Sequence, residues 1–271
     1  MTICIAAIAN ERYVIMAADR TITLNLEPME FGHGHSSKLY ELTPGVVLGA
    51  AGAPVYLPEL MDELRRRPPK GANGDWVSRA SNAMTNLRRL KIEQQILRKY
   101  GWNFETYEKY YSEGNLLEAH ARKILEEMDR YHLCVHLVSG AVQRRHGSIH
   151  GIEDPGVVDC FDAIGYTATG SGENYALQTL VRSDYTSGTP LKEAIYLVFE
   201  AKKAAEQAIG VGRRTDIRVV VSDARNIQLS DEQIAGLGHI YENKAKGAET
   251  LRGKVMAETE KWLPSGLRKL A

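Results

Sequence analysis

The sequence of 271 residues lacks net charge, because 34 lysine and arginine side chains balance 34 aspartate and glutamate side chains. A main partner that is nucleic acid or an anionic membrane requires a basic field, so the sequence argues against both. It also lacks any apolar run close to the roughly 20 residues that span a bilayer. No basic segment followed by a long apolar stretch stands at the start, so no signal peptide is expected.

Cysteine is scarce as well. The three cysteines, Cys4, Cys134 and Cys160, follow no disulfide or zinc spacing, which favours a reducing compartment. A hydrophobic content of 44% is enough to bury a full core in a chain of this length. These features together predict a cytoplasmic globular protein.

Two pairs of apolar runs predict two β-hairpins. Residues 2–9 and 13–18 are separated by a short polar break, and residues 39–52 repeat the arrangement around a Thr-Pro-Gly turn. The first two runs are continuous rather than alternating, so we expect both of their faces to be covered.

Helices and further strands follow along the chain. The apolar spacing predicts helices from Pro54 and from near Asp75, an inserted helical segment over 100–130, strands over 132–142 and 147–152, helices over 173–183 and 190–209, a strand over 216–223 and a helical tail beyond Ser230. One apolar stripe of the helix 190–209 comprises Leu191, Ile195, Val198, Ala205 and Ile209. Paired strands and paired helices in succession predict stacked sheets with helices outside them, in one domain over 1–271.

Five short motifs lie at the ends of these elements. Thr2 heads the first strand, AADR (17–20) ends the second, SKLYEL (37–42) starts the third, LGAAG (48–52) ends the fourth, and YTATGSG (166–172) precedes two helices. In order and spacing the set resembles proteasome β-type subunits and the related bacterial ATP-dependent threonine peptidase, members of the N-terminal-nucleophile hydrolases. The resemblance covers roughly residues 2–60 and 132–223. It implies an α+β fold, a four-layer αββα sandwich, to which the segment 100–130 and a C-terminal helical extension at about 230–271 are added.

Thr2 is the residue on which the chemistry depends. A threonine hydroxyl is a weak nucleophile without an adjacent base, and removal of Met1 would give Thr2 a free α-amine to act as that base. An α-amine titrates near ~7.7–8.0, so part of it is neutral at neutral pH. Thr2 could equally be an ordinary strand residue, since threonine favours strands.

The resemblance assigns four more residues to catalysis. Lys38 matches the family's lysine and would lower the pKa of the terminal amine by like-charge repulsion, and Asp19 matches the acid that holds that lysine. The backbone N–H of Gly52 would donate to the tetrahedral oxyanion, which needs close backbone approach. Ser171 matches the serine that bonds near the terminal amine.

The resemblance also bears on substrate binding, and at one place the sequence departs from it. Ala50 and Ile22 fall at substrate-pocket positions, and the small Ala50 leaves room for a bulky apolar group. The family usually has an acidic residue and a serine after the last long helix, but Ala208 and Val211 stand there. Either Asp216 or Thr215 could substitute for them.

The expected function is that of a threonine-type peptidase that cleaves peptides or unfolded proteins in a homo-oligomeric ring, with an ATPase unfoldase as a possible partner. No metal or organic cofactor is implied. Two other interpretations stay open: a non-catalytic ring or scaffold subunit, favoured by Ala208 and Val211, and an amidase or peptide ligase that uses the same nucleophile.

Two other clusters suggest binding sites but are weaker signals. His33 and His35 lie two residues apart, and His132, Cys134 and His136 would share one face of a strand. Neither set is completed nearby in the sequence to the four ligands of a zinc site. Gly170 and Gly172 precede a helix as in phosphate cradles, but the rest of that fingerprint is missing.

Overall fold

The computed structural model describes residues 2–20, 37–66, 73–114 and 117–262. The strands in these ranges form two five-stranded sheets in which every pairing is antiparallel. Sheet A has the order β10 (Arg225–Gln228), β9 (Thr215–Ser222), β2 (Tyr13–Asp19), β1 (Ile3–Ala9) and β8 (Tyr166–Gly170). Sheet B has the order β3 (Leu39–Thr43), β4 (Val46–Gly52), β5 (Val135–Gln143), β6 (His146–Glu153) and β7 (Val157–Cys160). The expectation of two antiparallel sheets is confirmed.

The two predicted hairpins are the pairs β1–β2 and β3–β4. In the first, Cys4 lies opposite Ala18, and every residue of β1 is buried, as its continuous apolar sequence predicts. Strand β10 was not predicted, because its four residues are mostly polar and exposed.

Apolar side chains fill the space between sheets A and B. Cys4, Ala6 and Ile8 of β1 form one cluster with residues of β4, β5 and β6. Alternate residues of each strand face this cluster, because successive side chains in a strand point to opposite faces. The faces of sheets A and B that meet in this cluster therefore form one core.

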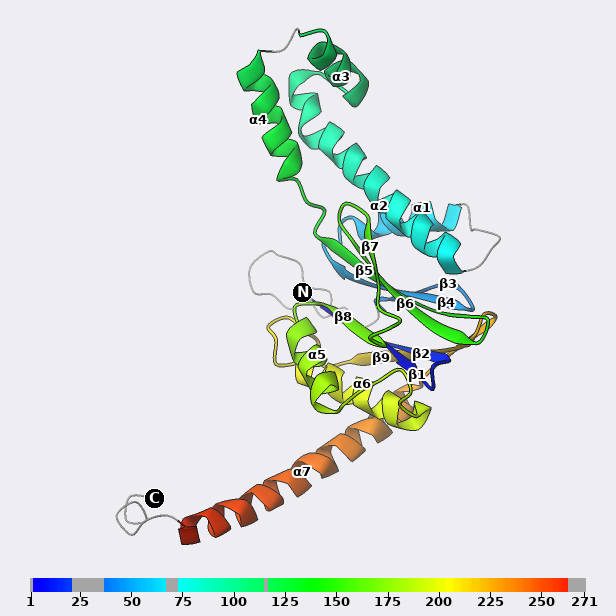
Figure 1. The fold of residues 1–271 in the computed structure, drawn as a ribbon, viewed down its shortest axis with the longest axis vertical. Helices are drawn as coiled ribbons and strands as arrows, with labels where there is room; N and C mark the ends of the chain where they lie inside the picture. The colour runs from blue at the N-terminus through cyan, green and yellow to red at the C-terminus, as the bar shows by residue number, and fades with distance from the viewer. Residues whose placement is uncertain (1, 21–36, 67–72, 115–116, 263–271) are drawn as a thin grey trace. The chain divides into compact units, whose positions relative to one another are not determined.

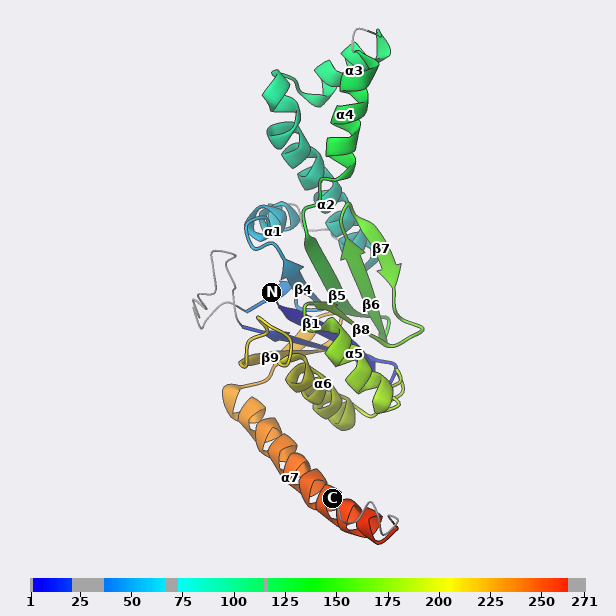
Figure 2. The same cartoon turned by 90° about the vertical axis from the view of Figure 1, so that its left-hand side faces the viewer.

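Helices pack against the other faces of the two sheets (Figures 1 and 2). The helices α5 (Glu173–Arg182) and α6 (Leu191–Ala205) contact β1 of sheet A. The helices α1 (Leu57–Arg66) and α2 (Asn73–Gln95) pack with sheet B around a second apolar cluster that includes Leu60, Trp76 and Met84. The predicted helices are present, and α6 begins directly after Pro190, as its start signal indicates.

The C-terminal boundary predicted for α6 was wrong. The helix ends at Ala205 rather than at 209, and Ile209 is 83% exposed instead of continuing the apolar stripe. The buried face of α6 instead carries Lys202, between Val198 and Ala205. A lysine thus takes a place where the helical period predicts an apolar side chain.

The segment 100–130 is helical, as predicted, and has a small core of its own. It contains a 3-10 helix (Leu97–Tyr100), α3 (Phe104–Ser112) and α4 (Glu118–Asp129). The last turn of α2 contributes Ile92 to this core and Ile96 follows directly after the helix; both pack with Tyr107 and residues of α4. One long helix therefore takes part in two separate apolar clusters.

The chain divides into two compact units, residues 1–228 and 229–271. The second unit contains the helix α7 (Asp231–Trp262), so the predicted helical tail is confirmed as far as residue 262. At its start Ser230 and Gln233 exchange hydrogen bonds, with each side chain accepting from the other's backbone N–H, as in a capping box. Of the helices that the structure describes, none is long and apolar enough to cross a membrane.

Candidate active site

The hairpin β1–β2 brings Thr2 and Asp19 to the same end of sheet A. Thr2 directly precedes β1 and Asp19 is the last residue of β2, and the register that pairs Cys4 with Ala18 makes them neighbours. The Thr2 hydroxyl donates to Asp19 Oδ1 at 2.7 Å, and the backbone N–H of Ile3 donates to the same oxygen at 3.0 Å. Asp19 is 0% exposed and Thr2 is 3% exposed.

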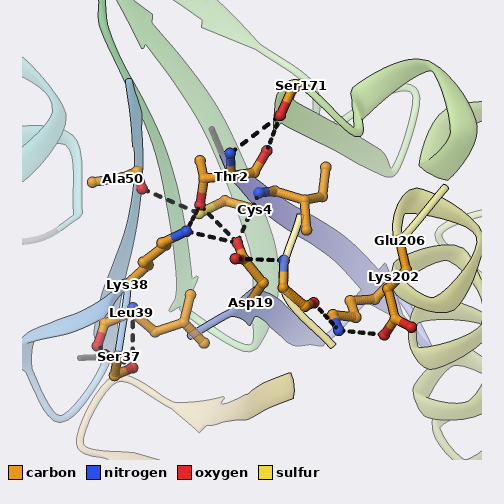
Figure 3. A network of polar contacts seen from close by, with 12 residues as sticks. Thr2, Cys4, Asp19, Ser37, Lys38, Leu39, Ala50, Ser171, Lys202 and Glu206 are labelled. Atoms are coloured by element: carbon orange, nitrogen blue, oxygen red, sulfur yellow. Dashed lines mark hydrogen bonds and ion pairs between the residues drawn. The ribbon is translucent and has the colours of Figure 1, made fainter. Parts of the chain in front are cut away.

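Lys38 reaches this pair from sheet B. It lies just before β3, where the Ser37 hydroxyl accepts a hydrogen bond from the N–H of Leu39 at 3.2 Å and fixes the entry to the strand. The Lys38 ammonium donates to Thr2 Oγ1, and it donates to Asp19 Oδ1 at 2.8 Å (Figure 3). Three ionisable or nucleophilic groups that are distant in the sequence therefore meet in one buried hydrogen-bonded triangle.

Electrostatics keep the Asp19 carboxylate charged in this buried place. Burial by itself would raise the pKa of Asp19, but the Lys38 ammonium and hydrogen bonds from Lys38, Ile3 and Thr2 outweigh it and hold the pKa below its ordinary value. The neighbouring thiol behaves oppositely, since burial raises the pKa of Cys4 to about 12. At neutral pH, therefore, Asp19 in the triangle is a carboxylate, and the neighbouring Cys4 is an unreactive protonated thiol.

Ser171 lies at the nitrogen of Thr2. Its hydroxyl accepts from Thr2 N at 3.2 Å and donates to the Thr2 carbonyl at 3.3 Å. Gly170, which precedes it, pairs with Ile3 and has a φ of 111°, and a Cβ there would lie 2.3 Å from the Thr2 carbonyl oxygen. Only glycine permits so close an approach of β8 to Thr2.

Gly52 is the last residue of β4, with a φ of 106°. A Cβ at this position would lie 1.9 Å from the carbonyl oxygen of Cys134, which also accepts the N–H of Ala53 at 2.9 Å. The strand end therefore requires glycine on conformational grounds. Its assignment as oxyanion donor stays a prediction.

The two substrate-pocket residues differ in what can be said of them. Ala50 is 1% exposed and belongs to the cluster that sheet B forms with α1 and α2, with Tyr40 packed against that cluster. Ile22 lies outside the described residues, as do His33 and His35. The substrate roles of Ala50 and Ile22 stay predictions.

A cavity of about 280 Å³ lies beside Ser171, among β5, β6, β8 and α5. Its walls are mainly apolar, with Phe161, Tyr166 and Leu177 among the lining residues, and Glu173 is its partly buried carboxyl. Burial, followed by the nearby Glu153, raises the pKa of Glu173. Thr169 and Glu173, which flank the segment 170–172, both line the cavity.

The histidine and cysteine cluster at 132–136 does not form the predicted strand face. Strand β5 begins only at Val135, and Cys134 has a φ of 51°, which breaks the alternation that the three side chains would need. His132 and His136 instead lie near the carboxylates of Asp154 and Glu153, at 3.5 and 3.7 Å. Within the described ranges, no three or more histidine, cysteine, aspartate or glutamate side chains lie close enough together to hold a metal ion.

The place of the missing acid and serine is taken by the connection between α6 and β9. The backbone N–H of Gly212 donates to Asp19 Oδ2 at 3.0 Å, and the buried Lys202 donates to the carbonyl of the same glycine at 2.8 Å. Asp216, which could have substituted, forms an ion pair with Arg20 at 2.6 Å. Sequence reasoning missed both Gly212 and Lys202, although Lys202 lies on the apolar stripe of α6.

Comparisons with known proteins show the fold. No protein-family model matches the sequence, and no curated protein does. Among solved structures, Anbu (ancestral beta-subunit) from Yersinia bercovieri is similar with a TM-score of 0.63 and 14% identity, over 93% of this chain and 96% of that chain. Anbu from Hyphomicrobium sp. strain MC1 is similar with a TM-score of 0.61 and 13% identity, over 92% of this chain and 97% of that chain. The likeness indicates that this chain has a proteasome-like fold.

Proposed function

We propose that this chain is a proteasome-like subunit and acts as a threonine peptidase, with Thr2 as its nucleophile after removal of Met1. The observation that carries the proposal is the buried triangle of Thr2 Oγ1, Lys38 Nζ and Asp19 Oδ1. An ion pair of a solvated surface lysine contributes little to stability, which does not explain why Lys38 is held in this buried place. Beside Thr2 Oγ1, however, the Lys38 ammonium would stabilise the negative charge that develops on a nucleophilic oxygen.

Acylation uses the amine that Thr2 would expose. Its nitrogen bonds to Ser171 and would take the hydroxyl proton, directly or through a water molecule, as Oγ1 attacks the peptide carbonyl. The backbone N–H of Gly52 is the proposed donor to the oxyanion. Collapse of the tetrahedral intermediate breaks the C–N bond, and the leaving amine receives the proton held by the α-amine.

Deacylation reverses these roles with water. The α-amine removes a proton from water, which attacks the ester carbon, and the ester bond breaks to restore the Thr2 hydroxyl and release a carboxylic acid. An amine in place of water would instead give a new amide, as in a peptide ligase. Neither step requires a metal or an organic cofactor.

The scissile peptide would extend to both sides of Thr2. Ala50 and Ile22 remain the proposed pocket residues on the acyl side. The leaving amine must lie near the α-amine that protonates it, and the proposed place for it is the cavity lined by Thr169 and Glu173, which flank the segment that contains Ser171. Its largely apolar lining supports binding of an extended peptide rather than of a small polar molecule.

The assembly in which this would happen is also a proposal. The packing of α1 and α2 on sheet B and of α5 and α6 on sheet A supports the four-layer αββα sandwich. The likeness to a protein described as an ancestral beta-subunit supports a homo-oligomeric ring. Peptides or unfolded proteins are the proposed substrates and an ATPase unfoldase is a possible partner. The spacing of the cysteines favours the cytoplasm.

The test is an intact mass measurement of the purified protein with and without a peptide epoxyketone, a reagent that needs a hydroxyl and a free amine on one terminal residue. We expect loss of the Met1 mass and a single adduct. Thr2→Ala should abolish the adduct, while Thr43→Val, a change at a half-buried threonine at the other end of β3 from Lys38, should retain it.

Retention of Met1 with no adduct would contradict the peptidase proposal and favour the non-catalytic ring subunit. An adduct that persists in Thr2→Ala would also contradict it, because the nucleophile would then lie elsewhere. If the adduct forms on Thr2, peptide cleavage followed by mass spectrometry in the presence of added amines separates hydrolysis from ligation.

A further inference from the structure

Lys202 on α6 is completely buried, at 0% exposed, and its ammonium uses three acceptors. It donates to Glu206 Oε1 at 2.5 Å, to the Gly212 carbonyl at 2.8 Å and to the Arg213 carbonyl at 3.0 Å. A lysine is almost never fully buried unless it is paired, so this arrangement requires a physical explanation. Its three acceptors belong to the end of α6 and to the connection that leads into β9.

Stability is a poor explanation for this lysine. Burial lowers the pKa of Lys202, so the folded protein binds this proton less tightly than the unfolded chain does, and the charge adds no stability to the fold. An apolar side chain of similar length in place of a buried ion pair is often neutral or stabilising. Neutralising Glu206 does not need Lys202 either, because the half-exposed Lys203 donates to Glu206 Oε2 at 2.6 Å.

The two carbonyls that Lys202 binds belong to the segment that touches Asp19. Gly212 donates its N–H to Asp19 Oδ2 at 3.0 Å and offers its carbonyl to Lys202. Both peptide groups of this glycine are therefore fixed, one by Asp19 and the other by Lys202. Without such anchors a glycine samples a wide range of conformations, and the N–H would lose its direction.

Charge acts in the same sense as geometry. The ionisable groups around Asp19 include Lys38 just before β3, Cys4 on β1 and Lys202 on α6, and removal of Met1 would add the Thr2 amine. Burial keeps the Cys4 thiol protonated at neutral pH, whereas both lysines interact electrostatically with the Asp19 carboxylate. Lys38 donates directly to Asp19 Oδ1. Lys202 donates to the Gly212 carbonyl, and the N–H of the same glycine donates to Asp19 Oδ2.

We propose that Lys202 is a positioning residue of the active site: it anchors the Gly212–Arg213 backbone so that the Gly212 N–H holds Asp19 in place and charged. It thus does the work for which an acid and a serine were expected at Ala208 and Val211. The inference rests on the proposed function, since Asp19 in turn orients Lys38 and Thr2. Lys202 touches none of the reacting groups.

The experiment measures the rate of epoxyketone adduct formation against pH in the full-length protein and in Lys202→Met. The matched control is Lys203→Met, which removes the neighbouring partner of Glu206 but has no bond to Gly212 or Arg213 in the structure described. We expect Lys202→Met to slow labelling by about 10- to 100-fold at neutral pH, the loss typical of a slightly misplaced catalytic group. In Lys202→Met, the fall of the labelling rate on the acid side of the pH profile should move to higher pH. Lys203→Met should keep the pH profile of the unchanged protein.

A second readout follows Asp19 without catalysis. In protein labelled with ¹³C-aspartate, Lys202→Met should raise the pKa of Asp19, because a nearby positive charge and the oriented N–H are lost. If Lys202→Met fails to fold, Lys202→Met/Glu206→Gln removes the charge and its partner together and should show the same upward shift. An unchanged Asp19 pKa in the folded variant overturns the inference.

The two proposals fail in different ways. If the unchanged protein takes no adduct, the peptidase proposal fails, while the Asp19 titration still decides whether Lys202 positions that carboxylate. If the unchanged protein is labelled and Lys202→Met is labelled at the same rate and with the same pH profile, the peptidase proposal stands and the role of Lys202 is refuted.

Discussion

The two carboxylate oxygens of Asp19 divide the candidate site into two halves that the chain builds differently. The Oδ1 half consists of Thr2, Ile3 and Lys38, which come from the starts of two strands. The Oδ2 half consists of Gly212, a backbone donor, and Lys202 behind it on a helix. The first half holds the proposed nucleophile and the lysine beside it, and the second holds the groups that we propose to orient them. Each can therefore be changed separately.

Asp19→Asn disrupts both halves and should have the largest effect. It leaves the buried Lys38 ammonium without its carboxylate, which destabilises a protein by about 3–5 kcal/mol when a buried pair loses one partner. Epoxyketone labelling should slow by at least about 100-fold, as when one aligned catalytic donor is removed. The control is Asp162→Asn, since Asp162 also accepts a backbone N–H, from Ile149 at 2.6 Å, but lies in the β7–β8 connection. Labelling of Asp162→Asn at the rate of Asp19→Asn would contradict the prediction.

The same variant has a distinct pH signature. The pKa of Asp19 is lowered by folding, so its contribution to stability is complete above the ordinary value of ~3.9 and disappears as pH falls through the lower folded value. The difference in the free energy of unfolding between the unchanged protein and Asp19→Asn should therefore be constant from about pH 5 to 7 and shrink below about pH 4. Urea titrations at several pH values measure it, and a difference that grows on acidification would refute the assignment.

A double-mutant cycle compares the two halves directly. Lys38→Met should slow labelling more than Lys202→Met, because Lys38 contacts Thr2 Oγ1 and Lys202 acts only through Gly212. Since both act on one carboxylate, the double variant should be slowed clearly less than the product of the two single losses, by a coupling of about 0.5–3 kcal/mol. Strict additivity of the two effects would show that the halves act independently of Asp19.

The smallest effect concerns the thiol beside the Oδ1 half. Burial raises the pKa of Cys4 to about 12, so it carries almost no thiolate at pH 8, while Cys134 and Cys160 are exposed. A thiol reagent should modify two cysteines per folded chain and three after unfolding, as counted by intact mass. Modification of Cys4 in the folded protein would indicate that the site opens far more than its burial suggests.

The Oδ1 half could be predicted from the sequence because its functional groups are side chains of particular residue types at strand ends. Continuous apolar runs predict β1 and β2, with a threonine and an acid at their ends, and the resemblance to proteasome β-type subunits adds the lysine before β3. The hairpin register then makes Thr2 and Asp19 neighbours. Here the local pattern and the fold agree.

The Oδ2 half could not be predicted in the same way. Its donor to Asp19 is a backbone N–H, which every residue except proline has and which carries no sequence signal. The end of α6 was placed four residues too late because Ile209 fits the apolar period although it lies in the connection. Lys202 fits that period as well, but a lysine in an amphipathic helix is normally solvated. Only the tertiary packing distinguishes the two residues.

The wide separation of the contacting residues has a consequence for the life of the chain before it is folded. Thr2 and Ser171 are 169 positions apart in the sequence, and Asp19 and Gly212 are 193 apart. Contacts of such long range form slowly, because the intervening chain loses entropy before they are made. A nascent or partly folded chain therefore has no assembled nucleophile with which to attack its neighbours. If the protein is a peptidase, its topology keeps it inactive during synthesis, because the site is complete only when the last elements of the first unit have packed.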